Sequence, residues 1–487
     1  MDFSRCLGRL GCLFAAAGLS ACAVGPNYRP PEVPVADSWH SPAATSLKPD
    51  SPDSTPLGSW WTVLNDPTLN QLVDQALAEN KTVKQALARV TEARARRAIT
   101  GASFWPSIGG SASGTKSDSN STLTSDNPGF STGTREVYDA GLDAGWEIDL
   151  FGGKRRAYES STAQLAATEA DLRDVLITLL GDVALSYVDV RTSQSRLTFA
   201  ERNLESQREV VDITDWRAQA GLATVLDVEQ AKSSYSQTLA AIPQLDSALE
   251  AAKNRLAVLT GQSPGALETL LTERKPIPVA PADVVSSIPA EVLRRRPDIR
   301  AAERRLAAQT AQVGVATAQL YPSLSLSGSI GVTASSAGDL LSNGLHSNRY
   351  GVSLNMPIFE AGALLQNVKA QNALVAEALA TYEATVLAAY EEIENALTDW
   401  ANEQKRHAAL IDAAESARLA SDLALTQYNS GLVDFQTVLT ADRQLISSED
   451  ALAVSDGEIT SNLIRLYKAF GGGWSVFPPA IVQASAP

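Results

Sequence analysis

The chain has 487 residues, which exceeds one ordinary hydrophobic core and predicts either one very extended domain or several compact ones. Its 40 basic and 55 acidic residues give a formal net charge of -15, which argues against nucleic acid as a partner because that needs a basic surface. No run of about eighteen apolar residues occurs, so the sequence predicts no transmembrane helix.

The amino terminus, residues 1–21, has the pattern of a lipoprotein signal peptide. Two arginines precede a short apolar run, Leu10 to Ala17, which is too short to span a bilayer. The run leads to LSAC, which resembles the lipobox of bacterial lipoproteins. That resemblance implies cleavage before Cys22 and covalent acylation of this residue. The other two cysteines would leave with the leader, so no intrachain disulfide is expected, and Ala23 implies sorting to the outer membrane.

The rest of the chain contains the same unit twice. The segment from Leu77, LAENKTVKQALARVTEARARRAITGASFWPSI, aligns without gaps on the segment from Leu293, LRRRPDIRAAERRLAAQTAQVGVATAQLYPSL. Each copy predicts a helix, a strand, a long loop, a second strand, a long helix, a turn and a returning helix. The predicted divisions are an extended, lipid-anchored arm (22–65), a first repeat (66–261), a linker (262–288), a second repeat (289–473) and a tail (474–487).

Four stretches show the apolar-polar alternation of β-strands, most clearly YDAGLDAGWEIDL, residues 138–150. An unpaired carboxylate in a dry interior is very costly, so the acidic face of this strand is predicted to lie in water. That face carries Asp139, Asp143, Glu147 and Asp149, and the apolar faces carry Tyr138, Leu142, Trp146, Leu324, Leu326, Val352 and Leu354. Residues 116–134 and 333–348, rich in Ser, Asn, Gly and Thr, predict the hairpin loops.

Residues 153–220 and 362–430 contain no proline and predict helices of about 65 residues, or ~100 Å. In the first, apolar residues recur every seven positions from Leu176 to Val211, which predicts left-handed coiled-coil packing. The returning helices are expected from about 223 to 259 and from about 434 to 470. Pro243 lies inside the first of them and predicts a kink or a split.

Four strands cannot close a membrane barrel, and an open sheet in lipid leaves backbone groups without hydrogen bonds. Oligomerisation removes the open edges. Outer-membrane barrels start at about eight strands, so two, three or four copies would give 8, 12 or 16 strands.

Several motifs resemble the outer-membrane lipoproteins of the TolC-like efflux family: IPAEVLRRRPDIRAAERRLAAQTAQVGVATAQLYPSLSLSG (288–328), CAVGPNYRPP (22–31), the paired Gly-Leu turns and FGGGW (470–474). The resemblance implies a mainly α fold with a membrane β-barrel portion, assembled as a trimer with a 12-stranded barrel and a 12-helix periplasmic tunnel. It implies a passive exit duct for small molecules, delivered by an inner-membrane transporter of the resistance-nodulation-division class through a periplasmic adaptor. The acidic strand face would then line the lumen, and the apolar face would contact outer-membrane lipid.

By the same resemblance, the turns after the long helices form the periplasmic tips, where the duct is gated and docks on the adaptor. The candidate residues are Asp215, Arg217, Gly221, Leu222, Asp227, Tyr428, Asn429, Gly431, Leu432 and Asp434. Glycine at each turn suits a backbone with positive φ. The family usually has an aromatic three residues before each tip glycine, but Ala218 stands there in the first copy, and Asn429 stands where arginine is common. No particular salt bridge is therefore transferred from the family.

Other functions remain open on the sequence alone. An exit duct for type I protein secretion would share the architecture, and a periplasmic coiled-coil scaffold without a pore would share the helices. An enzyme has little support, because the three histidines, His40, His346 and His407, show no ligand spacing. We expect no catalytic residue, no metal and no cofactor other than the covalent lipid on Cys22.

Overall fold

The computed structural model describes residues 23–31, 39–40, 58–119, 133–279 and 295–473. The predicted leader, the predicted lipidation site Cys22 and the tail 474–487 lie outside these ranges. The described residues divide into two units: 23–31, 92–119, 133–167 and 302–381 belong to the first, and 39–40, 58–91, 168–279, 295–301 and 382–473 belong to the second.

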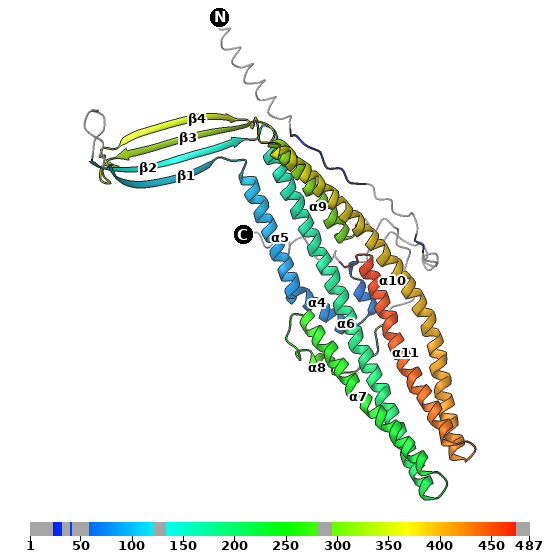
Figure 1. Ribbon diagram of the computed structural model, residues 1–487. Coiled ribbons are helices and arrows are strands. Elements are labelled where there is room, and N and C mark those ends of the chain that lie inside the picture. The colour runs from blue at the N-terminus through cyan, green and yellow to red at the C-terminus, as the bar shows by residue number, and fades with distance from the viewer. Residues whose placement is uncertain (1–22, 32–38, 41–57, 120–132, 280–294, 474–487) are drawn as a thin grey trace. The chain divides into compact units, whose positions relative to one another are not determined.

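The first unit contains one antiparallel sheet of four strands in the order β1-β2-β3-β4 (Figure 1). The strands are β1 (Ser107–Ser119), β2 (Gly133–Ile148), β3 (Ser323–Ala334) and β4 (Leu345–Asn355). The two hairpins come from the two sequence repeats, and β2 pairs with β3 to join them. Four strands were predicted, and four are present in the described part of the chain.

The register places the apolar residues of both repeats on one face. Residues directly opposite each other in antiparallel strands share a face of the sheet. The apolar pairs are Leu142 with Ile330, Trp146 with Leu326, Ile148 with Leu324, Leu326 with Val352, and Leu324 with Leu354. The polar pairs are Asp139 with Thr333, Asp143 with Ser329, and Glu147 with Ser325. The sheet therefore has one mainly apolar and one polar face, and the charged residues Lys116, Asp118 and Glu136 lie on the apolar face only near the loop end of β1 and β2.

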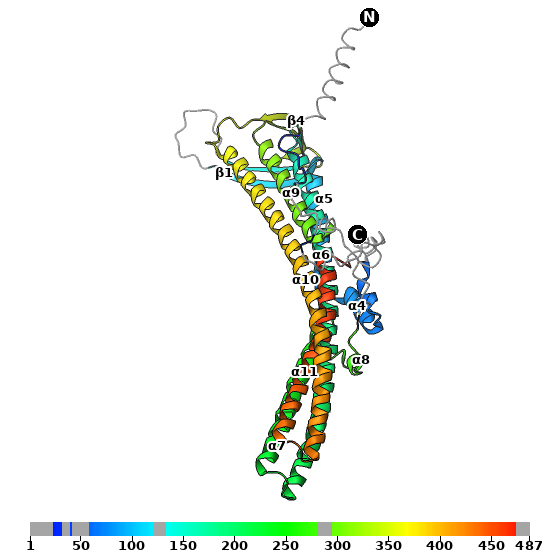
Figure 2. The same cartoon turned by 90° about the vertical axis from the view of Figure 1, so that its right-hand side faces the viewer.

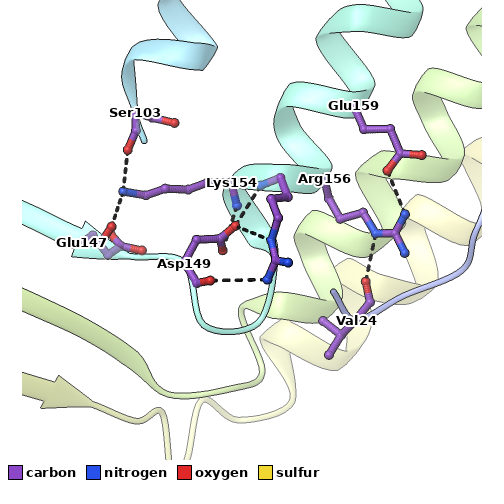
Figure 3. Close-up of polar contacts among 8 residues, drawn as sticks. Val24, Ser103, Glu147, Asp149, Lys154, Arg156 and Glu159 are labelled. Carbon is purple, nitrogen blue, oxygen red and sulfur yellow. Dashed lines mark hydrogen bonds and ion pairs between the residues drawn. The ribbon is translucent and has the colours of Figure 1, made fainter. Parts of the chain in front are cut away.

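Two predictions about the strands are wrong. The hairpin loops are shorter than expected, because β1 continues to Ser119 and Lys116 pairs with Glu136 through a 2.9 Å ion pair. β2 ends at Ile148, so Asp149 does not belong to its acidic face. The Asp149 carboxylate instead accepts hydrogen bonds from the backbone N–H groups of Lys154 and Arg155, at 3.2 and 2.9 Å (Figure 3). It satisfies donors at the start of the following helix, where a carboxylate is favoured.

The two long helices have nearly the predicted bounds. They are α6 (Gly153–Gln219) and α10 (Ala363–Asn429), each of 67 residues, or ~100 Å at 1.5 Å per residue. The heptad positions of α6 are buried from Leu176 to Leu197, but Leu204 and Val211 are only half-buried. Toward the end of α6 the buried residues are polar instead: Asn203, Gln207 and Thr214. The predicted apolar seam thus becomes a polar one.

The returning helices are α7 (Val225–Leu259) and α11 (Phe435–Ala469). α7 runs through Pro243 as a single helix, so the predicted split does not occur. A proline removes only one backbone hydrogen bond directly, and both halves of α7 are held by buried side chains such as Ala231 and Leu256. The shorter helices are α4 (Pro67–Glu79), α5 (Lys81–Ala102), α8 (Glu268–Leu271) and α9 (Pro297–Ala318) (Figure 2).

The predicted arm is not extended throughout. Residues Trp60–Leu64 form the short 3-10 helix η1. The Trp60 ring is buried and stacks on Tyr467 at a centroid distance of 5.5 Å, so these residues belong to the core of the second unit. Two adjacent tryptophans remove a large apolar area from water, which explains why this end of the arm folds. None of the helices that the structure describes is long and apolar enough to cross a membrane.

Candidate functional site

The turns that join the long helices to their returning helices have the same geometry in both repeats. Gly221 and Gly431 both have φ of 74°, as predicted from the need for a left-handed residue. At the first turn, Gly221 N–H donates to Ala218 O at 2.9 Å and Leu222 N–H donates to Arg217 O at 2.7 Å. At the second, Gly431 and Leu432 donate to Tyr428 O and Gln427 O at 2.9 Å each. Both helices therefore end in a Schellman motif.

The two tip turns lie at the same end of the second unit and are joined by Arg217 (Figure 2). Its Nη1 donates to the backbone carbonyl of Asn429 at 3.0 Å, and its guanidinium carbon lies 4.6 Å from the centre of the Tyr428 ring. Tyr428 is buried and meets Phe435 edge-on at 5.5 Å. The sequence named Arg217, Tyr428 and Asn429 as separate candidates, and the structure brings them into one contact between α6 and α10.

Two polar atoms at this contact lack a partner in the described part of the chain. They are the Tyr428 hydroxyl and Arg217 Nε, both buried. A buried polar group without a hydrogen bond is costly, and such groups in native proteins call for an explanation. Both atoms lie at the tip turns, where the sequence predicted gating contacts.

The acidic tip candidates have partners within their own helices. Asp227 and Thr224 form a capping box at the start of α7, and Asp434 caps α11 by accepting from Thr437 N–H at 3.0 Å. Hydrogen bonds from the Thr437 hydroxyl and backbone hold the pKa of Asp434 below its usual range. Asp215 accepts from Gln219 Nε2 at 2.7 Å. Their role in gating or in attracting cations stays a prediction.

Large apolar side chains are exposed around both tip turns. We call this set the apolar tip cluster: Trp216, Leu222, Val225, Leu226 and Leu432, each with about two thirds or more of its surface exposed. Exposed apolar residues that gather in one region mark sites of protein contact more often than scattered ones do. Leu222 and Leu432 were predicted as docking residues, whereas the other three were not.

A set of polar contacts joins α6 to α11 above the tips, and we call it the polar ladder. Glu449 of α11 is 2% exposed and accepts from Arg202 at 2.6 Å, from Asn203 at 3.1 Å and from Arg418. Arg196 pairs with Asp450 through two hydrogen bonds of 2.7 and 3.1 Å.

The last contact of the polar ladder is the Gln207–Asp442 pair. Gln207 Nε2 donates to Asp442 Oδ2 at 2.9 Å and to Ser234 Oγ at 3.1 Å. The sequence analysis did not predict the polar ladder. A signal was present, because Asp442 and Glu449 are seven residues apart in α11 and alternate with the buried residues Leu439 and Ala453.

The polar face of the sheet carries both signs of charge. Asp139 accepts a 2.6 Å hydrogen bond from Thr333 Oγ1. Asp143 pairs with Ser329, and Ser329 pairs in turn with Arg349 of β4, so Asp143 and Arg349 lie in one row across this face. Arg349 was not among the predicted residues, because it directly follows the predicted loop 333–348, whereas β4 begins earlier, at Leu345.

The structure shows no metal cluster in its described residues: no three or more His, Cys, Asp and Glu side chains there are placed to share an ion. His407 Nε2 lies 2.7 Å from Asp456 Oδ1, which makes it a contact between α10 and α11.

A sheet with one polar and one apolar face, joined to paired long helices that end in matching turns, defines a class of envelope channel proteins. The family model of the outer membrane efflux proteins matches residues 72–262 and again residues 288–472. The chain belongs to this family. It is an outer-membrane channel component of a tripartite efflux pump, and its fold is that of the solved channels of the family.

The relatives agree over nearly the whole chain. Nodulation protein T of Rhizobium leguminosarum bv. trifolii is 34% identical over 94% of this chain and 96% of its own length. The solvent efflux pump outer membrane protein SrpC of Pseudomonas putida is 31% identical, over 95% of this chain and 98% of its own length. The solved outer-membrane channel OprN is 38% identical, has a TM-score of 0.85, and matches 93% of this chain and 100% of its own. Channels of this family work with an adaptor and an inner-membrane transporter.

Proposed function

We propose that three copies of the chain form a continuous exit duct through the outer membrane and periplasm. Each copy would contribute its four strands to a 12-stranded barrel and its long helices to a 12-helix tunnel. The observation that carries this proposal is the four-stranded sheet, in which β1 and β4 each have only one neighbour among the described strands. In lipid, each such edge would leave backbone groups without partners at several kcal/mol each, and closure against neighbouring copies removes both edges.

The apolar face is proposed to contact lipid and the polar face to line the bore. Leu142 is 50% exposed and Val352 is 73% exposed, although both belong to the apolar face. An apolar face that stays this exposed among the described residues fits a hydrocarbon surrounding. The strands have 11 to 16 residues, and about 9 to 11 residues cross a bilayer in a tilted strand.

The tip turns are proposed to dock on a periplasmic adaptor that connects the duct to a transporter of the resistance-nodulation-division class. The apolar tip cluster supplies a surface that a partner can bury. The transporter would supply the energy, while this chain passes its cargo without a chemical step or cofactor.

The cargo is proposed to be small molecules selected by the pump. SrpC and TtgI of Pseudomonas putida are named for solvent and toluene efflux, and OpmQ of Pseudomonas aeruginosa for pyoverdine export. Because similar channels are named for such different cargoes, we infer that the inner-membrane pump, rather than the duct, selects the cargo. A lipid on Cys22, outside the described residues, is proposed as a second attachment beside the barrel, because several acyl chains bind a membrane stably.

Native mass spectrometry and planar-bilayer conductance of the detergent-extracted protein test the proposal together. We expect a homotrimer that conducts ions, and co-purification should recover an adaptor of an efflux pump rather than a protein-secretion adaptor. Val352→Pro, which removes a backbone donor from the edge strand β4, should abolish the trimer, whereas Leu423→Ala on α10 should not. A stable monomer without conductance would contradict the duct and favour a scaffold.

A further inference from the structure

The first described residues of the chain are held where the sheet meets the long helix. Val24 N–H donates to the carbonyl of Phe151, at 3.0 Å, in the turn between β2 and α6. Arg156, in the first turn of α6, lies beside this segment and points toward Val24 (Figure 3). Residues 23–28 and the parts of α6 and α9 that contact them here, 153–167 and 302–318, lie in the first unit.

Arg156 donates most of its side-chain hydrogen bonds to this segment. Its Nε donates to Val24 O at 3.2 Å, and its Nη2 donates to Gly25 O at 3.3 Å and to Asn27 Oδ1 at 2.6 Å. The third nitrogen, Nη1, pairs with Glu159 at 2.8 Å. The side chain is only 6% exposed. If the segment left, Arg156 would lose three of its four side-chain hydrogen bonds, and hydrogen bonds from a charged donor are among the stronger ones.

Glycines allow the backbones to approach this closely. Gly152 has φ of 80°, and a Cβ there would lie 2.6 Å from Ala23 Cα. Gly25 has φ of 91°, and a Cβ there would lie 2.5 Å from Gly314 Cα in α9. A Cβ on Gly314 would meet the Arg156 side chain at 2.7 Å. Gly25 of the arm, and Gly152 and Gly314 of the framework that α6 and α9 form around it, thus make a contact with no room for a side chain.

Tyr28 extends the contact along α9. Its hydroxyl donates to Glu303 Oε1 at 3.0 Å, and the guanidinium carbon of Arg304 lies 5.5 Å from the centre of its ring. The framework therefore contacts the segment in three ways. The backbones approach closely at residues 23 and 25, the amide oxygen of residue 27 accepts a hydrogen bond, and the phenol of residue 28 donates one.

We propose that Gly152, Arg156 and Gly314 form a peptide seat that recognises residues 23–28 and fixes the mature amino terminus to the junction of β2 and α6. The seat requires a small residue at position 23, glycine at 25 and a hydrogen-bond acceptor at 27. It ties the residue next to the predicted acylation site to the base of the sheet, so the anchor and the sheet are held as one body. The anchoring role rests on the proposed acylation of Cys22, whereas the seat itself does not.

Electron paramagnetic resonance of a nitroxide on Pro26→Cys tests the seat in the full-length protein. Position 26 is exposed, and Cys22 is the only other cysteine predicted in the mature chain. Arg156→Ala changes the framework side of the seat, and Gly25→Ala changes the arm side and leaves the framework intact. The matched control is Arg155→Ala, because Arg155 pairs with Asp149 and makes no contact with residues 23–28 in the described structure.

We expect slow nitroxide motion in the parent and in Arg155→Ala. In Arg156→Ala and Gly25→Ala we expect a roughly tenfold shorter correlation time, as for a freed terminus. Hydrogen exchange of the unlabelled chain gives a second readout, since the Val24 amide should lose its protection in the same two variants. Equal nitroxide mobility and equal exchange in all four proteins would overturn the proposal.

Palmitate labelling and the mass of the complex, measured on the same samples, separate this proposal from the others. An ordered arm without lipid would support the peptide seat and contradict the lipid anchor. If the arm is mobile in a lipidated, conducting trimer, the seat fails and the duct stands.

Discussion

Arg217 of α6 lies over the ring of Tyr428 of α10, with 4.6 Å between its guanidinium carbon and the ring centre. The same side chain donates to the carbonyl of Asn429, so one arginine joins the tip turn of the first repeat to the tip turn of the second. A cation-π contact of this kind is worth about 0.5–1 kcal/mol at an exposed site, and a charged hydrogen bond about 1.5–3 kcal/mol. The pair is therefore strong enough to bias the tips toward one arrangement.

We predict that Arg217→Ala loosens the tips and raises the mean conductance in planar bilayers. Lysine at this position keeps the charge over Tyr428 but loses the planar fork, so Arg217→Lys should fall between the parent and the alanine variant. Arg208→Ala, an exposed arginine on the same helix, is the control for the lost charge. Equal conductance in Arg217→Ala and Arg208→Ala would show that the contact does not restrain the pore.

A second prediction concerns Glu449, which joins α11 to α6 and α10. Glu449→Gln removes a buried charge that balances Arg202 and Arg418. Loss of one partner from a buried pair costs about 3–5 kcal/mol, but the two arginine side chains are 52% and 51% exposed, so we expect about 1–3 kcal/mol. Denaturant unfolding measures the loss, and a double-mutant cycle with Arg418→Ala measures the coupling. Additive effects would refute a direct interaction.

The pH dependence of stability should report Asp442. Burial raises the pKa of its carboxyl, the hydrogen bond from Gln207 and the charge of Arg443 oppose the rise, and the charge of Glu449 adds to it. At low pH the group is protonated in both folded and unfolded chains and has no effect. As the pH rises past 3.8, the unfolded chain loses its proton first, so the folded state loses stability until the pH passes the raised folded pKa.

Asp442→Asn should therefore be more stable than the parent at neutral pH. The difference between their melting temperatures should grow from about pH 4 upward and then level off above the folded pKa of Asp442. Asp412→Asn, an exposed aspartate on α10, is the matched control. A difference that stays constant over this range would contradict the burial of the charge.

The bounds of the long helices and the faces of the strands could be predicted from the sequence, because they depend on residues that are close together in the chain. The absence of proline predicted α6 and α10 to within about one residue, and alternation predicted which residues share a face of the sheet. The strand end was missed at Asp149, because an acid that continues an alternating pattern looks the same as an acid that caps the next helix. The hairpin loops were overestimated because serine-rich polar strands resemble loops.

Contacts between distant residues could not be predicted in the same way. Arg156 reaches Val24 and Asn27, and Arg202 reaches Glu449, 247 residues away. These contacts depend on how elements pack, and local spacing contains no information about that. Part of the polar ladder was nevertheless readable, since an acid on an apolar heptad position must find a partner or carry a large cost.

The last prediction tests which face of the sheet lines the bore. Asp143 and Arg349 lie in one row of the polar face, so their charges should act on passing ions in opposite directions. Asp143→Asn should reduce the preference for cations, and Arg349→Ala should increase it, as measured by the reversal potential in a KCl gradient. Both shifts should shrink from about 0.01 M to about 1 M salt, because the Debye length falls from about 30 Å to about 3 Å.

Asp118→Asn is the matched control for this experiment. Asp118 pairs with Thr134, which lies four residues before Tyr138, so it belongs to the opposite face of the same sheet. The substitution removes the same charge as Asp143→Asn, but from the face proposed to contact lipid, and it should leave the reversal potential unchanged. A shift with Asp118→Asn and none with Asp143→Asn would mean that the assignment of the two faces is reversed.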